Sequence, residues 1–215
     1  MAIRKYDETY YPSQKIINAS YKKIEKELLH HADIITFKEL KELDITTAQI
    51  RGLQKFQKLR KISRGIYIKH DELDDRYLEL QKKYTHIIFS HETALYLHDL
   101  SDVTPSNYTV TVPNNYNAYY LKEKEQMTVK RAVEERYNAG IIEMKSPYGN
   151  PIYVYDKEKT ICDILANRNN TDIQILSTAL KSYFARQDKD LNTLMIYAKL
   201  LKVDKILRNY MEVLL

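Results

Sequence analysis

The first long run of hydrophobic and polar positions in this sequence has the period of a helix. Between residues 13 and 31, Ile16, Ile17, Ile24 and Leu28 recur at helical spacing, and lysines and glutamates occupy positions between them. Residues three and four apart lie on one face of an α-helix, so this spacing predicts an amphipathic helix.

Two shorter helices are predicted next, each beginning after a threonine that can cap it. Thr36 stands three residues before Glu39, which is the spacing of a capping box, and a helix is expected over residues 37–43. Residues 44–47, Asp44-Ile45-Thr46-Thr47, provide a tight connection and a second hydroxyl cap before residues 48–58, whose apolar positions fall on one side. The pattern therefore predicts two helices joined by a tight turn.

The pattern then changes to alternation with a period of two. Residues 59–62 and 65–69 alternate apolar and polar side chains on either side of a turn at Gly65, a residue that can adopt positive φ. Helix, helix, turn, helix and hairpin is the order of a winged helix-turn-helix, whose third helix can enter the major groove of DNA. We therefore predict a winged helix-turn-helix DNA-binding domain over residues 1–70.

The rest of the chain, residues 71–215, predicts a mixed α/β domain that ends in helices. It opens with a connecting helix and continues with alternating short strands and helices, one of them capped by Ser90. The fold class expected for the whole chain is α+β. The expected helices cover residues 71–84, 91–97, 156–166, 172–186, 191–201 and 203–213, and the expected strands cover 87–89, 107–112, 141–144 and 152–155, the last two forming a hairpin.

The composition indicates a packed globular protein and favours a reducing compartment. Of 215 residues, 44% are hydrophobic, and the single cysteine, Cys162, excludes an internal disulfide framework. Its apolar neighbours favour a buried thiol over a reactive one. No apolar run is long enough to span a bilayer, and the N-terminus lacks the apolar core of a signal peptide. We expect a cytoplasmic protein with no membrane partner.

Charge is concentrated where the DNA-binding helix and hairpin are predicted. The formal net charge of +5 is modest, but residues 47–69 hold seven lysines and arginines and no aspartate or glutamate. So dense a patch of one sign favours an anionic partner, here double-stranded DNA. The alternative is a winged helix that contacts only proteins. A second basic region at residues 181–208 could help to clamp DNA, although a solvated helical face is favoured.

The types of residue in this patch suit distinct contacts with DNA. Threonines at the helix start can bind phosphate, glutamines can hydrogen-bond adenine, arginine can address guanine, and cations in the hairpin can contact the flanking backbone or the minor groove. The predicted DNA-binding residues are Thr46, Thr47, Gln49, Arg51, Gln54, Lys55, Lys58, Arg60, Lys61 and Arg64.

Catalytic chemistry has only one candidate centre in the sequence. His91, Glu92 and His98 lie close in sequence, but no third ligand stands at a metal-binding spacing, which favours packing or capping histidines. The four glycines are isolated, so no glycine-rich phosphate loop is present. The sequence therefore predicts no catalytic residue, no metal and no cofactor.

Three segments resemble the AbiEi family of antitoxins, which belong to type IV toxin–antitoxin systems. They are residues 36–69, ending in Arg64-Gly65-Ile66-Tyr67, residues 90–113, which contain the string Ser90-His91-Glu92-Thr93-Ala94-Leu95-Tyr96-Leu97-His98-Asp99-Leu100, and residues 154–165. The resemblance covers most of the chain. It departs from the family at Gln57, where relatives often have glycine, which leaves the geometry of the turn before the hairpin open.

The resemblance implies a bacterial antitoxin that represses its own operon by binding inverted repeats in the promoter. Such an antitoxin counters a nucleotidyltransferase-like toxin without a stable complex, in systems linked to phage defence by abortive infection. Because separate monomers can fill inverted repeats, a monomer in solution is expected. The family's basic surface corresponds here to Arg51, Lys55, Lys58, Arg60, Lys61 and Arg64.

Two other functions remain open at this point. One is an antitoxin that masks its toxin directly, with the C-terminal helices as the binding surface. The other is an enzyme that modifies nucleic acid or toxin, centred on His91, Glu92 and His98.

Overall fold

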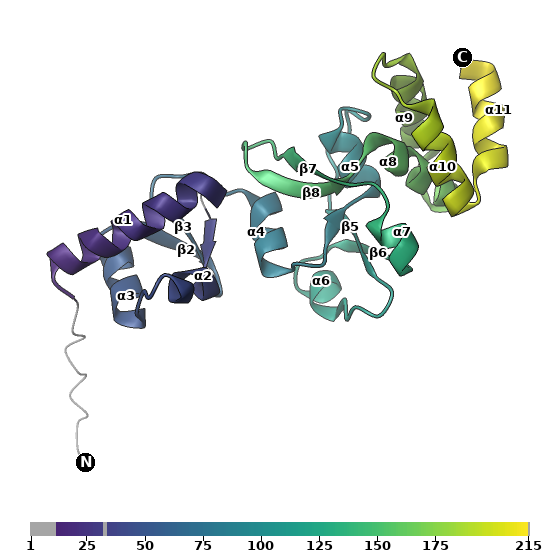
Figure 1. Ribbon diagram of the computed structural model, residues 1–215. Helices are drawn as coiled ribbons and strands as arrows, with labels where there is room; N and C mark the ends of the chain where they lie inside the picture. Colours follow the sequence, from purple (N-terminus) through teal and green to yellow (C-terminus); the bar gives the residue numbers. More distant parts are fainter. Residues whose placement is uncertain (1–11, 32–33, 215) are drawn as a thin grey trace. The chain divides into compact units, whose positions relative to one another are not determined.

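The computed structural model describes residues 12–31 and 34–214, and the chain divides into two compact units (Figure 1). Unit 1 comprises residues 1–83 and 148–151, and unit 2 comprises residues 84–147 and 152–215. Both units combine helices with a small sheet. The mixed α+β fold class predicted from the sequence is therefore confirmed.

In the residues that the structure describes, unit 1 has four helices and a three-stranded antiparallel sheet in the order β1-β3-β2. The predicted hairpin is present, but its second strand also pairs with a strand that the sequence did not predict. That strand has only three residues and runs directly into a helix, so it is too short to show an alternating pattern. The elements are α1 (Gln14–His31), β1 (Ile34–Thr36), α2 (Phe37–Glu42), α3 (Thr47–Lys55), β2 (Leu59–Ser63), β3 (Ile66–Lys69) and α4 (Arg76–Lys83).

The core of unit 1 forms between α1, α3 and the sheet. Ile17 and Ile24 of α1 are fully buried in one cluster with Leu53 of α3, as the helical spacing of these residues requires. The two helices approach closely at Gly52, where an added Cβ would lie only 2.4 Å from Ile17 Cδ1. An added Cβ would force the end of the Ile17 side chain to move, so glycine at residue 52 favours this close approach of α1 and α3.

The predicted capping box at α2 is confirmed. The Thr36 amide donates to Glu39 Oε2 at 2.6 Å, and the Glu39 amide donates to Thr36 Oγ1 at 3.2 Å. The other oxygen of Glu39 accepts from Lys82 Nζ of α4 at 2.7 Å. These hydrogen bonds and the ion pair outweigh partial burial and lower the pKa of the Glu39 carboxyl. One carboxylate thus caps α2 and holds α4 to it.

Buried Asp75 explains why α4 and residues 148–151 belong to unit 1. One oxygen of its carboxylate accepts from the amides of Tyr77 and Leu78, which caps α4. The other accepts from Asn150 Nδ2 at 2.9 Å. Charge-assisted hydrogen bonds of this kind satisfy a carboxylate that is 1% exposed.

Unit 2 contains a five-stranded sheet in the order β6-β5-β4-β8-β7 followed by helices. Strand β4 is antiparallel to β5 and parallel to β8, and β5 is parallel to β6. Helix α8 packs against α5, α9 and α10 (Figure 1). The elements are β4 (Ile88–Phe89), α5 (His91–Leu97), β5 (Thr109–Pro113), α6 (Tyr119–Glu123), β6 (Thr128–Ala132), α7 (Glu134–Asn138), β7 (Ile141–Lys145), β8 (Pro151–Tyr155), α8 (Lys157–Ala166), the 3₁₀ turn η1 (Arg168–Asn170), α9 (Ile173–Ala185), α10 (Leu191–Leu201) and α11 (Asp204–Leu214).

Besides the short turn η1, two helices and one strand among the described residues of unit 2 were not predicted from the sequence, and one predicted cap is wrong. The missed elements, α6, β6 and α7, are each five residues long and carry mostly exposed or half-buried side chains, so they lack a clear hydrophobic period. Ser90 occupies the N-cap position of α5 but makes no capping hydrogen bond. Its hydroxyl instead accepts from Thr111 Oγ1 of β5 at 2.9 Å.

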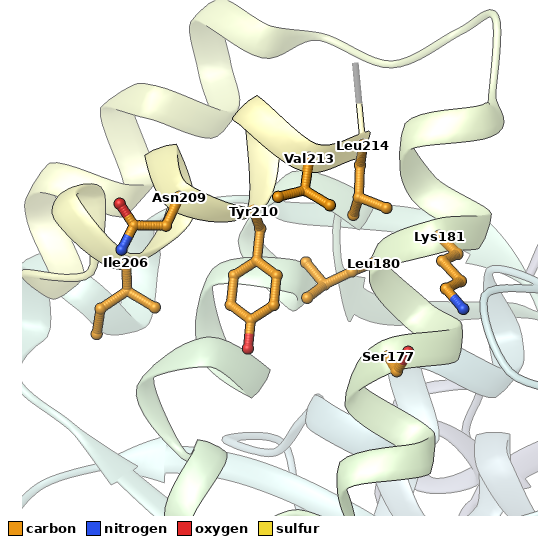
Figure 2. Close-up of a pocket in the computed structure, with 8 residues that line it drawn as sticks. All are labelled: Ser177, Leu180, Lys181, Ile206, Asn209, Tyr210, Val213 and Leu214. Carbon is orange, nitrogen blue, oxygen red and sulfur yellow. The ribbon is translucent and has the colours of Figure 1, made fainter.

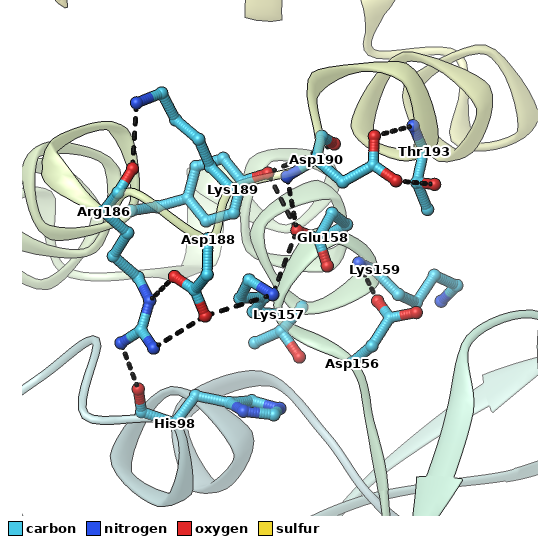
Figure 3. Close-up of polar contacts among 12 residues, drawn as sticks. His98, Asp156, Lys157, Glu158, Lys159, Arg186, Asp188, Lys189, Asp190 and Thr193 are labelled. Atoms are coloured by element: carbon cyan, nitrogen blue, oxygen red, sulfur yellow. Dashed lines mark hydrogen bonds and ion pairs between the residues drawn. The ribbon is translucent and has the colours of Figure 1, made fainter.

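Polar side chains fasten α8 to the segment between α9 and α10 (Figure 3). Asp156 caps α8 by accepting from the Lys159 amide at 2.7 Å. Buried Glu158 accepts from the Tyr183 hydroxyl at 3.0 Å and from the Asp190 amide at 3.1 Å. Arg186 completes the group by pairing with the neighbouring Asp188 carboxylate. The helical end of unit 2 is thus held by directed hydrogen bonds as well as by apolar packing.

Gln57, the second residue after the end of α3, gives a test of backbone strain. Gln57 has φ +53°, and the Lys58 amide donates to the Leu53 carbonyl at 2.8 Å, as in a Schellman cap that usually has glycine at this position. We predict that Gln57→Gly raises the free energy of unfolding by about 0.5–1 kcal/mol, and that β-branched Gln57→Val lowers it by about 1 kcal/mol. Urea denaturation checks both values, and a destabilised Gln57→Gly variant would contradict the prediction.

Candidate nucleic-acid interface

The start of α3 is fixed by a second capping box. The Gln49 amide donates to Thr46 Oγ1 at 3.2 Å, and the Thr46 amide donates to Gln49 Oε1 at 2.7 Å. Thr46 and Thr47 are both exposed at this helix end, where backbone N–H groups and the helix dipole favour an anion. Both residues therefore lie where the sequence placed them, at the first turn of the candidate recognition helix.

Gln49, which the sequence suggested as an adenine contact, makes hydrogen bonds within the protein at both ends of its side chain. Its side-chain oxygen closes the capping box, and its Nε2 donates to Ser20 Oγ of α1 at 3.0 Å. These two hydrogen bonds hold the amide against α1 and the start of α3. The signal that could have revealed this role is the spacing Thr-x-x-Gln, which repeats the Thr36 and Glu39 box.

The outer face of α3 carries the other predicted contacts. Arg51 and Lys55 are exposed and Gln54 is half-exposed, whereas Ile50 and Leu53 on the opposite face are buried. Arg51 has no hydrogen bond or ion pair with any residue that the structure describes. Its guanidinium is therefore available to a ligand.

The turn of the β2–β3 hairpin presents two further cations. Arg64 is exposed beside Gly65, whose φ of +75° forms the turn and whose carbonyl accepts from the Phe37 amide at 2.6 Å. Lys61 is exposed on β2, just before an irregularity in its pairing with β3. Within the described residues neither cation has a partner. The hairpin is thus held rigidly to α2 while its cations face solvent.

Two predicted phosphate contacts are already engaged within the protein. Arg60 pairs with Asp74 at 2.8 Å and donates to the Glu72 carbonyl at 2.9 Å. Lys58 Nζ lies 5.1 Å from the centre of the Tyr21 ring, a cation–π contact. The sequence window that lacked acids ended at residue 69, and the acidic run that pairs Arg60 begins at Asp71. Counting charges five residues further along the chain, to Asp74, would have included this partner.

The rival catalytic centre consists of side chains with separate structural partners. His91 Nδ1 lies 3.0 Å from Ser90 Oγ, and Glu92 Oε2 accepts from Thr109 Oγ1 at 3.1 Å. His98 Nε2 lies 2.7 Å from the Tyr155 carbonyl, which can only accept, so this nitrogen donates. Burial lowers the pKa of His91 to about 3 and also lowers that of His98. A neutral, buried imidazole with these pKa values is poorly suited to proton transfer near neutral pH.

The described part of the chain was also compared with what a metal site, a reactive thiol and a membrane-spanning helix require. No group of three or more histidine, cysteine, aspartate or glutamate side chains could hold a metal ion in residues 12–31 and 34–214. Cys162 is fully buried, and burial raises the pKa of its thiol. Across the same residues, no helix has the length and apolar character needed to cross a membrane.

Comparison with known proteins adds no family assignment. No protein-family model matches this chain, and no curated protein matches it. The candidate interface is therefore argued from the geometry and charge of α3 and the β2–β3 hairpin.

The buried imidazole of His91 predicts how stability changes with pH. Its pKa is about 3 in the folded protein and 6.5 in the unfolded chain, so the contribution of the neutral imidazole is complete above pH 6.5 and is lost as pH falls toward 3. The loss is about 1.4 kcal/mol per pH unit within this window.

Asparagine tolerates the positive φ of 50° at residue 91. In the variant His91→Asn, the slope of the free energy of unfolding against pH should therefore be smaller by about 1.4 kcal/mol per pH unit between pH 6 and about 4. Urea denaturation of both proteins at each pH measures the difference. Parallel curves would show that the imidazole charges without penalty, which would contradict its burial.

Proposed function

We propose that this chain is a sequence-specific DNA-binding regulator and that unit 1 is a winged helix-turn-helix. The observation that carries the proposal is the set of three exposed cations without a partner in the described residues, Arg51 on α3 and Lys61 and Arg64 on the hairpin. Free cations on a helix and an adjoining hairpin suit a ligand that is both grooved and polyanionic.

Helix α3 would lie in the major groove with its first turn toward the phosphate backbone. Arg51 is suited to guanine and Gln54 to adenine, since neither side chain is tied to another described residue. Thr46, Thr47 and Lys55 would contact phosphate, and Lys61 and Arg64 would bind the flanking backbone or the minor groove. Gln49 holds α3 on α1 and so acts as a positioning residue.

The regulator that fits best is an antitoxin of the AbiEi type. In this proposal the chain binds inverted repeats in its own promoter as monomers and counters a nucleotidyltransferase-like toxin in the bacterial cytoplasm without a stable complex. The segment of residues 90–105 supports a structural role for the family-like string, because Ala94, Leu95 and Leu100 are fully buried in the core of unit 2. A core helix explains this string without any catalytic function.

Binding of the purified chain to the DNA upstream of its own gene tests the proposal. We expect selective binding over scrambled DNA, with affinity that falls steeply as salt rises. Lys61→Ala and Arg64→Ala should each reduce the salt slope by about 0.9 per lost phosphate contact, whereas Arg51→Ala should reduce the preference for the promoter sequence.

The matched control for these variants is Lys199→Ala, an exposed lysine of unit 2. It lowers net charge by the same amount and should leave promoter binding unchanged. Equal weak binding to both DNAs, or an equal effect of Lys199→Ala, would reduce the interaction to non-specific charge and overturn the proposal.

The Arg60 and Asp74 ion pair gives a second prediction. Asp74→Asn removes a negative charge and releases the Arg60 guanidinium, so DNA affinity should rise about three- to fivefold. Glu72→Gln is the control, because Glu72 bonds Arg60 only through its backbone carbonyl and loses the same charge. The gain in DNA affinity should disappear in the double variant that combines Asp74→Asn with Arg60→Ala. Equal gains in Asp74→Asn and Glu72→Gln would show that Arg60 takes no part in binding.

A further inference from the structure

Helices α9 and α11 of unit 2 enclose an apolar groove with a volume of about 500 Å³ (Figure 2). Its floor is Leu180 of α9, which is 1% exposed, and its rim includes Val213 of α11, which is 82% exposed. Figure 2 shows the Tyr210 ring and the Ile206 side chain projecting from α11 into the same space. Contiguous apolar side chains exposed at a surface are typical of an interaction site.

The shape of the groove suits a helix better than a small molecule. Small-molecule sites bury most of the ligand surface, whereas a ligand beside Val213 would remain largely in water. An amphipathic helix needs only one covered face, because its polar face stays in solvent. The lining from Ile206 to Leu214 runs for about 12 Å, or roughly two helical turns, which accommodates apolar anchors one and two turns apart.

The charge around the groove selects the kind of helix. Lys181 is the charged side chain that lines it, whereas the charges of α11 lie outside the lining and comprise Asp204 and Glu212 as well as Lys205 and Arg208. Lys181 has no partner among the described residues. A second copy of this chain that packed groove against groove would bring another Lys181 to this lysine, which like-charge repulsion disfavours. A carboxylate of an acidic partner would pair with it.

We propose that the α9–α11 groove binds an acidic amphipathic helix of another protein. Apolar side chains of that helix would fill the space above Leu180, and its carboxylates would pair with Lys181 at the rim. The groove lies wholly within unit 2, so this inference does not depend on DNA binding by unit 1.

The probe is a fluorescein-labelled synthetic peptide about four helical turns long, with leucines at alternating three- and four-residue steps and glutamates on its polar face. One control peptide has the same composition in scrambled order, and another has lysine in place of each glutamate. Fluorescence anisotropy with the full chain should give a dissociation constant about tenfold lower for the probe than for either control.

Two pairs of variants locate the binding. Val213→Glu places a charge at the rim, and Ile196→Glu makes the same change at a 63% exposed position of α10 outside the lining. Lys181→Glu reverses the charge at the groove, and Lys199→Glu does so on α10. The first member of each pair should weaken probe binding by about threefold or more, and the second should not. All four positions are exposed, which limits effects on folding.

Several results would overturn the inference. If the scrambled peptide binds as well as the probe, the groove does not recognise an amphipathic helix. Equal effects of Lys181→Glu and Lys199→Glu would show that peptide binding depends only on the net charge of the protein. A dimer in sedimentation velocity that Val213→Glu converts to a monomer would assign the groove to a second copy. Promoter DNA that competes with the probe, with binding lost in Lys181→Glu, would assign it to nucleic acid. Promoter binding measured on the same variants keeps this outcome separate from the function of unit 1.

Discussion

The contact between Gly52 and Ile17 is the constraint on which unit 1 depends. An added Cβ at residue 52 would lie 2.4 Å from Ile17 Cδ1, so the side-chain-free surface of glycine lets α3 lie directly on α1. This close approach brings Gln49 within 3.0 Å of Ser20, and the resulting hydrogen bond fixes the rotation of α3 about its axis. Because that rotation is fixed, Arg51 and Gln54 face outward while Ile50 and Leu53 face the core. The orientation of the candidate interface is thus a consequence of packing on its opposite side.

Unit 2 contains a comparable close approach around a buried charge. Lys159 is 2% exposed, pairs with Asp163 at 2.7 Å and lies 4.3 Å from the centre of the Tyr155 ring. Gly140 makes room for it, since a Cβ there would lie 2.8 Å from Lys159 Cβ. A buried ion pair adds little net stability compared with apolar packing, but removing one partner leaves an uncompensated charge. Lys159, Asp163 and Gly140 therefore form a group in which each residue restricts the others.

The sequence was most informative where a local pattern decides local structure. The Thr36 and Glu39 capping box, the hairpin around Gly65 and the long amphipathic helices follow from spacing alone, and all are present. Gln57 is instructive because the resemblance pointed to glycine at this position. The backbone adopts the left-handed conformation that glycine favours, with φ +53°, although the side chain is glutamine. Strands β1 and β6 depend on pairing with strands elsewhere in the chain, which no local period encodes.

Residue type and charge along the sequence do not show which side chains already have partners in the fold, as Arg60 and Gln49 illustrate. A count of cations treats each as available, yet availability depends on partners that folding brings from elsewhere in the chain. Asp74 reaches Arg60 through a turn after β3, and Ser20 reaches Gln49 from another helix, so both partners lie outside the window of residues 47–69. What remains for a ligand is the smaller set of Arg51, Lys61 and Arg64. A polyanion gains most from cations that have no internal partner to lose, because no internal ion pair has to be broken before it binds.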